Sequence, residues 1–414
     1  MSVCSLRAAL ALTVPAVAAI LPAAPAAARA RLDPGFATGG VLFDRGILGG
    51  LGDDGVYFQA VRALPDGALV LLAQYRCAMG CRGFETLRTT AAGVPDGAAG
   101  QPGRPPGTAL LPSGEDFGTL ETGALVRADG AVVMTHFPIA LSGDVGPPLL
   151  RVVVPGGEGT VEVPLAQPFS PRAVLPDGGL GGLSDRKVMR LGPDMAPDPA
   201  FGAAGAAPVP AALRTVAGLG AGARGGIRVG GSDGHGLVLA VMNARGRLVR
   251  VSHLRVPGWG ALGSWGQVAQ VAVRADGAAV VVAGFSGVNV PRTGLGVIGV
   301  FRPDGRPDPR FGAGGLVRVA AGSPAVALAP GGRLVVAGAQ AGPRGDEHLR
   351  LVVRRLLPDG RTDRAFGVVS VPTPATQFIG IGADVDARGR VVVAGGAFTT
   401  YGSSGALALR LLPS

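Results

Sequence analysis

Two short motifs in this chain match patterns that could perform chemistry. Residues 230–234 read GGSDG, which matches the G-x-S-x-G pattern of serine hydrolases, and His235 follows. Residues 220–225 read GAGARG, which matches the G-x-G-x-x-G pattern of dinucleotide-binding loops. Both patterns need a helix after the loop, but strand-like sequence follows each of them. A chain with 71 glycines produces such matches by chance, so neither motif predicts a catalytic residue.

Two cysteines lie four residues apart in the segment YRCAMGCRG, at Cys77 and Cys81. In an exported protein a disulfide between them is the favoured interpretation, and free thiols are the alternative. A metal half-site would need a second cysteine pair or a nearby histidine, and the sequence offers neither. The four histidines have no partner at ligand-like spacing. We therefore expect no metal and no cofactor.

Two tryptophans, Trp259 and Trp265, lie in the segment VPGWGALGSWGQ. Two aromatic rings six residues apart could stack on a sugar or on a partner side chain. They could instead fill a joint between two structural units. Both interpretations stay open, and these are the two binding residues that the sequence suggests.

A longer pattern organises the chain around these residues. One phrase, containing Asp, Phe and Gly, occurs four times: RLDPGFATGG, APDPAFGAAG, RPDPRFGAGG and RTDRAFGVVS. Its phenylalanines are separated by multiples of 55 residues, which is typical of a repeat architecture. We predict that these phenylalanines are core residues between neighbouring units: Phe36, Phe201, Phe311 and Phe366.

A second repeat is a pair of valine-rich strands joined by a turn of the Pro-Asp-Gly type. Asp accepts a hydrogen bond from its own backbone two residues on, and Gly adopts positive φ without penalty. Seven such hairpins occur, with turns at Gly67, Gly130, Gly178, Gly225, Gly277, Gly332 and Gly389. A third strand and a short fourth strand follow in the best-preserved units. The pattern predicts an all-β fold, a seven-bladed β-propeller of four-stranded blades.

The two ends of the chain complement each other. The C-terminus stops at RLLPS, where other units continue into the phrase, and the segment from Arg31 begins with that phrase. We therefore expect the N-terminal strand to join the last blade and close the ring, which removes open strand edges. Residues 31–414 would form a single domain with blades at roughly 57–120, 121–165, 166–210, 211–262, 263–320, 321–372, and 373–414 plus 31–43.

The combination of a PDG turn, an LVVAG-like strand, R-x-x-PDG and D-x-x-FG-x-x-G resembles the delta-60 repeat of bacterial exported and surface proteins. The resemblance is strong over residues 267–414 and 31–43 and eroded between 90 and 260, where a Gly- and Pro-rich insertion at 98–120 departs from it. It implies a propeller-like fold. The family has no common catalytic motif, so the resemblance leaves the function open.

The N-terminus has the features of a signal peptide over residues 1–30. Arg7 precedes an apolar run from Ala8 to Leu21, and Ala28-Arg29-Ala30 offers a cleavage site. Prolines interrupt the apolar run, so an uncleaved membrane span is the weaker alternative. We expect a secreted or cell-envelope protein, a monomer, with no transmembrane segment after cleavage.

The net charge of +10 comes almost entirely from arginine. An exported basic protein would meet an envelope glycan, another anionic polymer or an acidic protein. Nucleic acid is not expected as a partner, because no basic stretch is interleaved with aromatic residues. The favoured function is a non-enzymatic binding or scaffold protein that presents loops on a propeller. The alternative is a propeller lyase or hydrolase with a site at the central channel.

Overall fold

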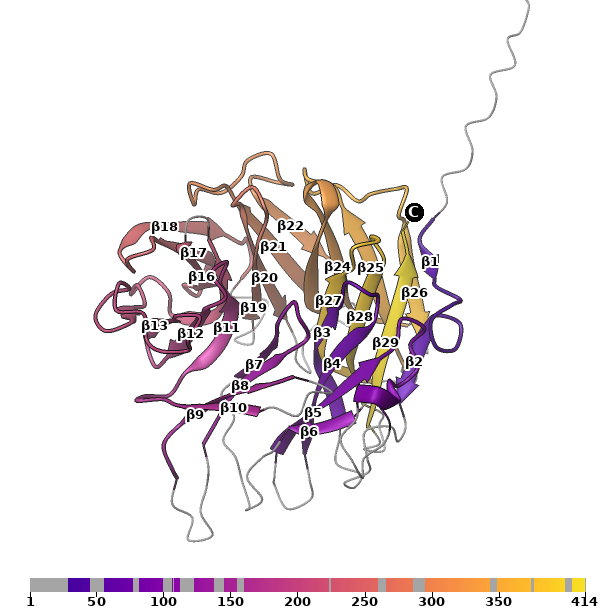
Figure 1. Cartoon of the computed structure of the whole chain (residues 1–414). Coiled ribbons are helices and arrows are strands. Elements are labelled where there is room, and N and C mark those ends of the chain that lie inside the picture. The colour runs from indigo at the N-terminus through magenta and orange to yellow at the C-terminus, as the bar shows by residue number, and fades with distance from the viewer. Residues whose placement is uncertain are drawn as a thin grey trace, which may run out of the picture.

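A computed structural model of the chain describes residues 29–44, 56–76, 82–99, 106, 108–111, 123–137, 145–154, 160–222, 225–259, 266–285, 295–342, 348–373, 376–398 and 404–413. These residues form seven antiparallel sheets (Figure 1). Helical structure within them is limited to short 3-10 turns such as η1 (Gly97–Ala99) and η4 (Pro330–Gly332). None of the helices in these ranges has the length and apolar character needed to cross a membrane.

Each sheet is one blade of a propeller, and its strands pair in chain order. The predicted all-β fold with seven four-stranded blades is therefore confirmed. Blade 1 contains β3 (Val56–Ala63), β4 (Leu69–Arg76), β5 (Arg82–Thr89) and β6 (Thr108–Leu111); blade 2 contains β7 (Gly123–Val126), β8 (Val132–His136), β9 (Leu149–Val153) and β10 (Thr160–Pro164); and blade 3 contains β11 (Ser170–Val174), β12 (Leu180–Ser184), β13 (Lys187–Leu191) and β14 (Ala206–Pro208). Blade 4 contains β15 (Thr215–Ala221), β16 (Ile227–Ser232), β17 (Gly236–Met242) and β18 (Leu248–Arg255); blade 5 contains β19 (Gly266–Val273), β20 (Ala279–Phe285), β21 (Leu295–Phe301) and β22 (Leu316–Val319); and blade 6 contains β23 (Gly322–Ala329), β24 (Arg333–Ala341), β25 (Leu349–Leu356) and β26 (Val368–Pro372). Blade 7 contains β27 (Gln377–Val385), β28 (Val391–Phe398) and β29 (Ser404–Leu412), joined by β1 (Arg31–Leu32) and β2 (Val41–Asp44).

The blades form a closed ring. The first strand of every blade contacts the first strands of both neighbouring blades, and β27 of blade 7 contacts β3 of blade 1. These seven first strands therefore surround the central axis. Both β1 and β2 pair with β29, with Arg31 opposite Leu412 and Val41 opposite Leu409 (Figure 1). The N-terminal segment completes the last blade, as the sequence predicts.

The hairpin turns owe their shape to the Asp-Gly pair. In blade 1, Asp66 Oδ1 accepts the N–H of Ala68 at 2.9 Å, and Gly67 has a φ of 89°. Equivalent hydrogen bonds occur at Asp129, Asp177 and Asp276. Positive φ is accessible to glycine without a steric penalty, so these residues hold the first strand against the second in blades 1, 2, 3 and 5.

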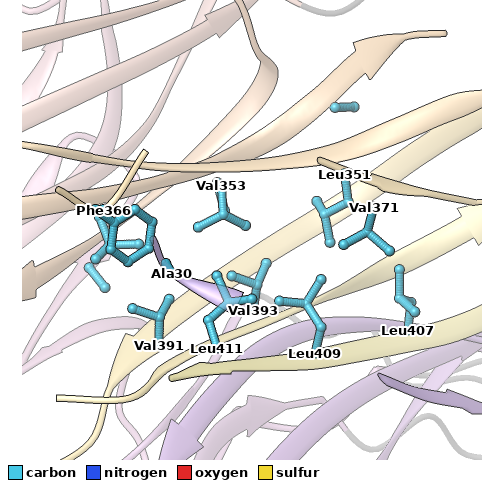
Figure 2. Close-up of a cluster of buried hydrophobic side chains, with 14 of the residues drawn as sticks. Ala30, Leu351, Val353, Phe366, Val371, Val391, Val393, Leu407, Leu409 and Leu411 are labelled. Atoms are coloured by element: carbon cyan, nitrogen blue, oxygen red, sulfur yellow. The ribbon is translucent and has the colours of Figure 1, made fainter. Parts of the chain in front are cut away.

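The hydrophobic core is divided into seven clusters, and each cluster lies between two adjacent blades. Figure 2 shows the cluster between blades 6 and 7, where Phe366 lies near Val391 and Leu411. This arrangement follows from a repeat fold, in which each unit buries its apolar face only against its neighbours.

The repeated phenylalanine anchors these joints. In blade 5, Phe311 is fully buried and its ring lies against Gly360, in the third-to-fourth turn of blade 6. The next residue, Gly312, donates its N–H to Asp359 O of the same turn at 2.7 Å. The same hydrogen bond joins Ala37 to Ala92 O at 2.7 Å and Gly202 to Arg245 O at 2.9 Å. The phrase is thus a connector between blades.

The N-terminal end takes part in the last of these joints. Ala30 donates its N–H to Phe366 O at 3.0 Å, and its methyl group lies in the cluster of Figure 2. Arg29 lies against Gly367. Cleavage at the predicted boundary after Ala30 would remove both contacts.

The first strands of most blades contain a β-bulge. Six of the seven first strands carry a register shift against the second strand, as between Phe58 and Ala60 in β3. Such bulges increase the local twist of a strand. Side chains also join these strands: Gln270 of β19 both donates to Val326 O and accepts from Val326 N–H, at 2.8 and 2.9 Å.

Candidate functional site

The connections between strands lie on two faces of the ring, because successive strands are antiparallel. The first-to-second and third-to-fourth connections share one face, which is named the corner face. The second-to-third connections and the links between blades share the opposite face. Hairpin turns and the Asp–Phe phrases therefore all belong to the corner face.

The aspartates of the phrase are bound by arginines within the fold. Asp33 Oδ2 accepts from Arg410 Nε at 2.8 Å, and Asp363 Oδ2 accepts from Arg355 Nε at 2.8 Å. Each arginine also lies over the phenylalanine of its phrase, with Arg410 at 4.6 Å from the ring of Phe36. Side-chain oxygens of these aspartates accept the N–H two residues on. The phrase is structural, and its aspartates neutralise Arg410 and Arg355.

Blade 1 contains a fifth copy of this corner that sequence reasoning missed. Asp96 donates its N–H to Arg88 O at 3.0 Å, as Asp363 does to Arg355 O, and Arg88 Nε lies 3.3 Å from Asp96 Oδ2. The position of the phenylalanine holds Ala99, which is buried. The signal that could have revealed it is Pro95-Asp96, at the spacing from the third strand seen in other blades.

Most of the residues that the sequence singled out lie in the hydrophobic core or outside the described residues. Phe36, Phe201, Phe311 and Phe366 are fully buried. Trp259 is only 7% exposed and lies in the cluster between blades 4 and 5. That position matches the alternative in which it fills a joint, and it leaves little of the indole for stacking on a ligand. Trp265, Cys77 and Cys81 lie outside the described residues.

The G-x-S-x-G segment forms a turn between two strands, β16 and β17. Ser232 Oγ accepts the N–H of Gly234 at 3.0 Å, and Asp233 Oδ1 accepts the N–H groups of His235 and Gly236. Asp233 Oδ2 lies 2.8 Å from Nδ1 of His253 on the outermost strand. These groups serve the turn. Throughout the described ranges, no three His, Cys, Asp or Glu side chains gather as a metal site would require.

A buried polar group lies between blades 1 and 2. His136, at the end of β8, is 2% exposed, and its Nδ1 has no hydrogen-bond partner within the described structure. Arg151 of β9 and Glu162 of β10 lie on the same face of blade 2 and form an ion pair. Burial lowers the pKa of His136 below its usual 6.5, Arg151 lowers it further, and Glu162 partly opposes this. The native state therefore favours neutral His136.

We predict that stability falls in acid through His136. Below about pH 6.5 the unfolded histidine binds a proton that the native histidine resists, so unfolding is favoured by up to about 1.4 kcal/mol per pH unit until the native pKa is reached. Urea unfolding of His136→Gln between pH 7 and 5 should show a shallower loss of stability than the unchanged protein. The exposed His235→Gln serves as control, and equal slopes for all three proteins would contradict the prediction.

Arginines gather on the corner face of blades 4 and 5. The third-to-fourth turn of blade 5, residues 302–306, packs on the adjacent end of blade 4. Gly305 lies against Val241 and Arg250, and Arg228 Nη2 donates to Pro303 O at 3.1 Å. The equivalent turn of blade 4 is residues 243–247. Four arginines of these two turns, together with Arg250 of β18, are named the basic edge: Arg245, Arg247, Arg250, Arg302 and Arg306.

The basic edge has one carboxylate. Asp304 Oδ2 lies 3.2 Å from Arg302 Nη2 and 3.9 Å from Arg306 Nε, and all three side chains are substantially exposed. The N–H of Arg306 lowers the pKa of Asp304, and Arg302, Arg306 and Arg250 lower it further. In the described part of the chain, Arg245, Arg247 and Arg250 have no carboxylate within 4 Å. The edge is therefore strongly positive and able to bind anions.

Comparisons with known proteins add little to this geometry. No protein-family model matches the chain, and no curated protein matches it. Similar solved structures include a protein of unknown function from Dyadobacter fermentans, with 12% identity, a TM-score of 0.49 and coverage of 92% of this chain and 100% of that one. The NanB sialidase from Streptococcus pneumoniae has 10% identity, a TM-score of 0.42 and coverage of 89% and 70%. An alpha-L-arabinofuranosidase from Fusarium graminearum has 11% identity, a TM-score of 0.40 and coverage of 90% and 96%. Such likeness carries no argument about function, since unrelated activities share this fold.

Proposed function

We propose that this chain is an exported, non-enzymatic binding protein of the cell envelope, which holds an anionic polymer or surface on its basic edge. One observation carries the proposal: of the five arginines of the basic edge, only Arg302 and Arg306 have a carboxylate, that of Asp304, within 4 Å in the described structure. We further propose that the blades are diverged delta-60 repeats. The equivalent hydrogen bonds of the phrase in several blades support this kinship.

Arg245 and Arg247 of the basic edge form no ion pair within the described structure, unlike the arginines that the fold uses. The arginines that the fold uses, such as Arg410 and Arg355, lie buried or half-buried beside an aspartate of the phrase. Arg245 and Arg247 are exposed, and Asn243 Oδ1 fixes their turn through their backbone N–H groups, at 3.0 Å each. Clustered like charges oppose folding and favour an oppositely charged partner. The side chains of Arg245 and Arg247 are therefore available for binding.

We expect the protein to co-sediment with washed cell envelopes of its source at low salt and to be released at high salt. The variant R245A/R247A should bind at least about tenfold more weakly, because each basic residue near an anionic surface contributes about 1 kcal/mol. The control R214A/R255A removes two exposed arginines from the opposite face of the same blade, and it should bind as the unchanged protein does.

Two results would count against the proposal. Equal loss in both double variants would show that only the net charge acts, without a defined edge. No binding at either salt concentration would make a soluble ligand, or the enzymatic alternative at the central channel, the better hypothesis.

A further inference from the structure

The outermost strand of blade 4 exposes two large apolar side chains inside the basic edge. Leu248 is 50% exposed and Val249 is 62% exposed, and they lie in sequence between Arg247 and Arg250. Exposed single aliphatic residues are ordinary on protein surfaces, but an adjacent pair flanked by unneutralised arginines is a distinct feature.

A β-bulge produces this exposure. In the pairing of β17 with β18, Met242 is opposite Leu248 and Val241 is opposite Arg250, so Val249 has no partner. A bulge leaves one residue out of the ladder and redirects the side chains beside it. Since β18 is the last strand of its sheet, no further strand of the blade covers Leu248 and Val249.

Another blade exposes apolar residues without the arginines. In blade 2, Val154 is 47% exposed and Val161 is 58% exposed. The arginine of that region, Arg151, is buried and paired with Glu162, the residue after Val161. Blade 2 therefore offers exposed apolar residues beside a carboxylate and without an unpaired arginine, and it provides a control for the apolar pair of blade 4.

We infer that the basic edge docks on an anionic lipid membrane, with Leu248 and Val249 entering the boundary between headgroups and acyl chains. This inference rests on the proposed function and names the surface that is bound. Guanidinium groups suit lipid phosphates, because their planar donors match phosphate oxygens. Membrane affinity grows with both the buried apolar area and the attraction to anionic headgroups. A soluble polysaccharide would use the arginines but would gain nothing from the two exposed aliphatic side chains, so the pair favours lipid.

The test compares vesicles of phosphatidylcholine alone with vesicles that contain 30% phosphatidylglycerol, a composition chosen as roughly that of an anionic leaflet. The unchanged protein should sediment with the anionic vesicles only. Leu248→Ser combined with Val249→Ser should weaken this binding about tenfold, whereas Val154→Ser combined with Val161→Ser should leave it unchanged. Binding to dextran sulfate, a soluble polyanion, should be the same for both serine variants and weaker for R245A/R247A.

Insertion itself can be followed by fluorescence. Val249→Trp should gain emission that brominated phosphatidylglycerol quenches, and Val161→Trp should not. If the Leu248 and Val249 serine variant binds anionic vesicles as tightly as the unchanged protein, the lipid inference is wrong. The proposed function then stands only if R245A/R247A still loses envelope binding, so the two failures are distinguishable. All these side chains are exposed, and a preserved melting temperature confirms that each variant folds.

Discussion

Replacing Asp33 with alanine should lower the free energy of unfolding by about 3–5 kcal/mol. Asp33 accepts from Arg410 Nε at 2.8 Å, and both residues are buried at the seam where the N-terminal segment joins blade 7. Without this carboxylate the buried charge of Arg410 loses its ion-pair partner and keeps only the hydrogen bond from Nη1 to Ala91 O, and Arg390 Nη1 loses a neighbour at 3.9 Å. Urea unfolding at neutral pH measures the effect.

The chain supplies a matched control at the same position of the phrase. Asp308 also accepts the N–H two residues on, but the third strand of blade 5 has Val300 where blade 7 has Arg410. Asp308→Ala should therefore cost only about 1 kcal/mol, the usual value of a lost turn hydrogen bond. Removing both charges at the seam with Asp33→Ala and Arg410→Met should recover part of the loss. Equal effects of Asp33→Ala and Asp308→Ala would show that the buried ion pair contributes nothing to closure.

The blades were predictable because the shape of each hairpin turn depends on residues within the turn itself. The Asp-Gly pair fixes a hairpin through bonds within a few residues, so its sequence pattern survives in every blade where it acts. The partners of the phrase were not predictable in this way. Asp33 pairs with Arg410 of β29, which lies at the other end of the chain. A local sequence pattern gives no sign of such a contact. The corner in blade 1 was not predicted, because Ala99 stands at the position where the other four copies of the phrase have phenylalanine.

The basic edge could not be predicted from the sequence either. Net charge is a property of the whole chain, and it does not tell which arginines are neutralised. Arg355 and Arg250 look alike in sequence, yet the first pairs with Asp363 and the second, half-buried beside Gly305, has no carboxylate within 4 Å in the described structure. The exposure of Val249 depends on a one-residue register shift, which only the pairing of β17 with β18 reveals. Repeat patterns predict the scaffold, whereas its surface depends on positions where the repeats differ.

Replacing Phe366 with alanine should destabilise the protein by about 3–5 kcal/mol, the usual range for a large aromatic residue deleted from a core. Its ring is fully buried among Val391, Val393 and Leu411 of the next blade (Figure 2). Arg355 lies 4.8 Å from the ring centre and would lose this contact as well. Phe366→Leu should recover part of the stability, because it fills part of the cavity.

The control for this substitution lies two residues away. Val368 is 54% exposed on β26, so Val368→Ala should change the free energy of unfolding by no more than about 0.5 kcal/mol. A large effect at Phe366 with a small one at Val368 would show that the phrase stabilises the joint between blades through its ring, and not through strand β26. If Phe366→Ala cost less than about 1 kcal/mol, the joint would depend on the backbone hydrogen bonds of the phrase instead. The repeated phenylalanine would then be a sequence feature of the repeat that contributes little to the stability of the joint between blades.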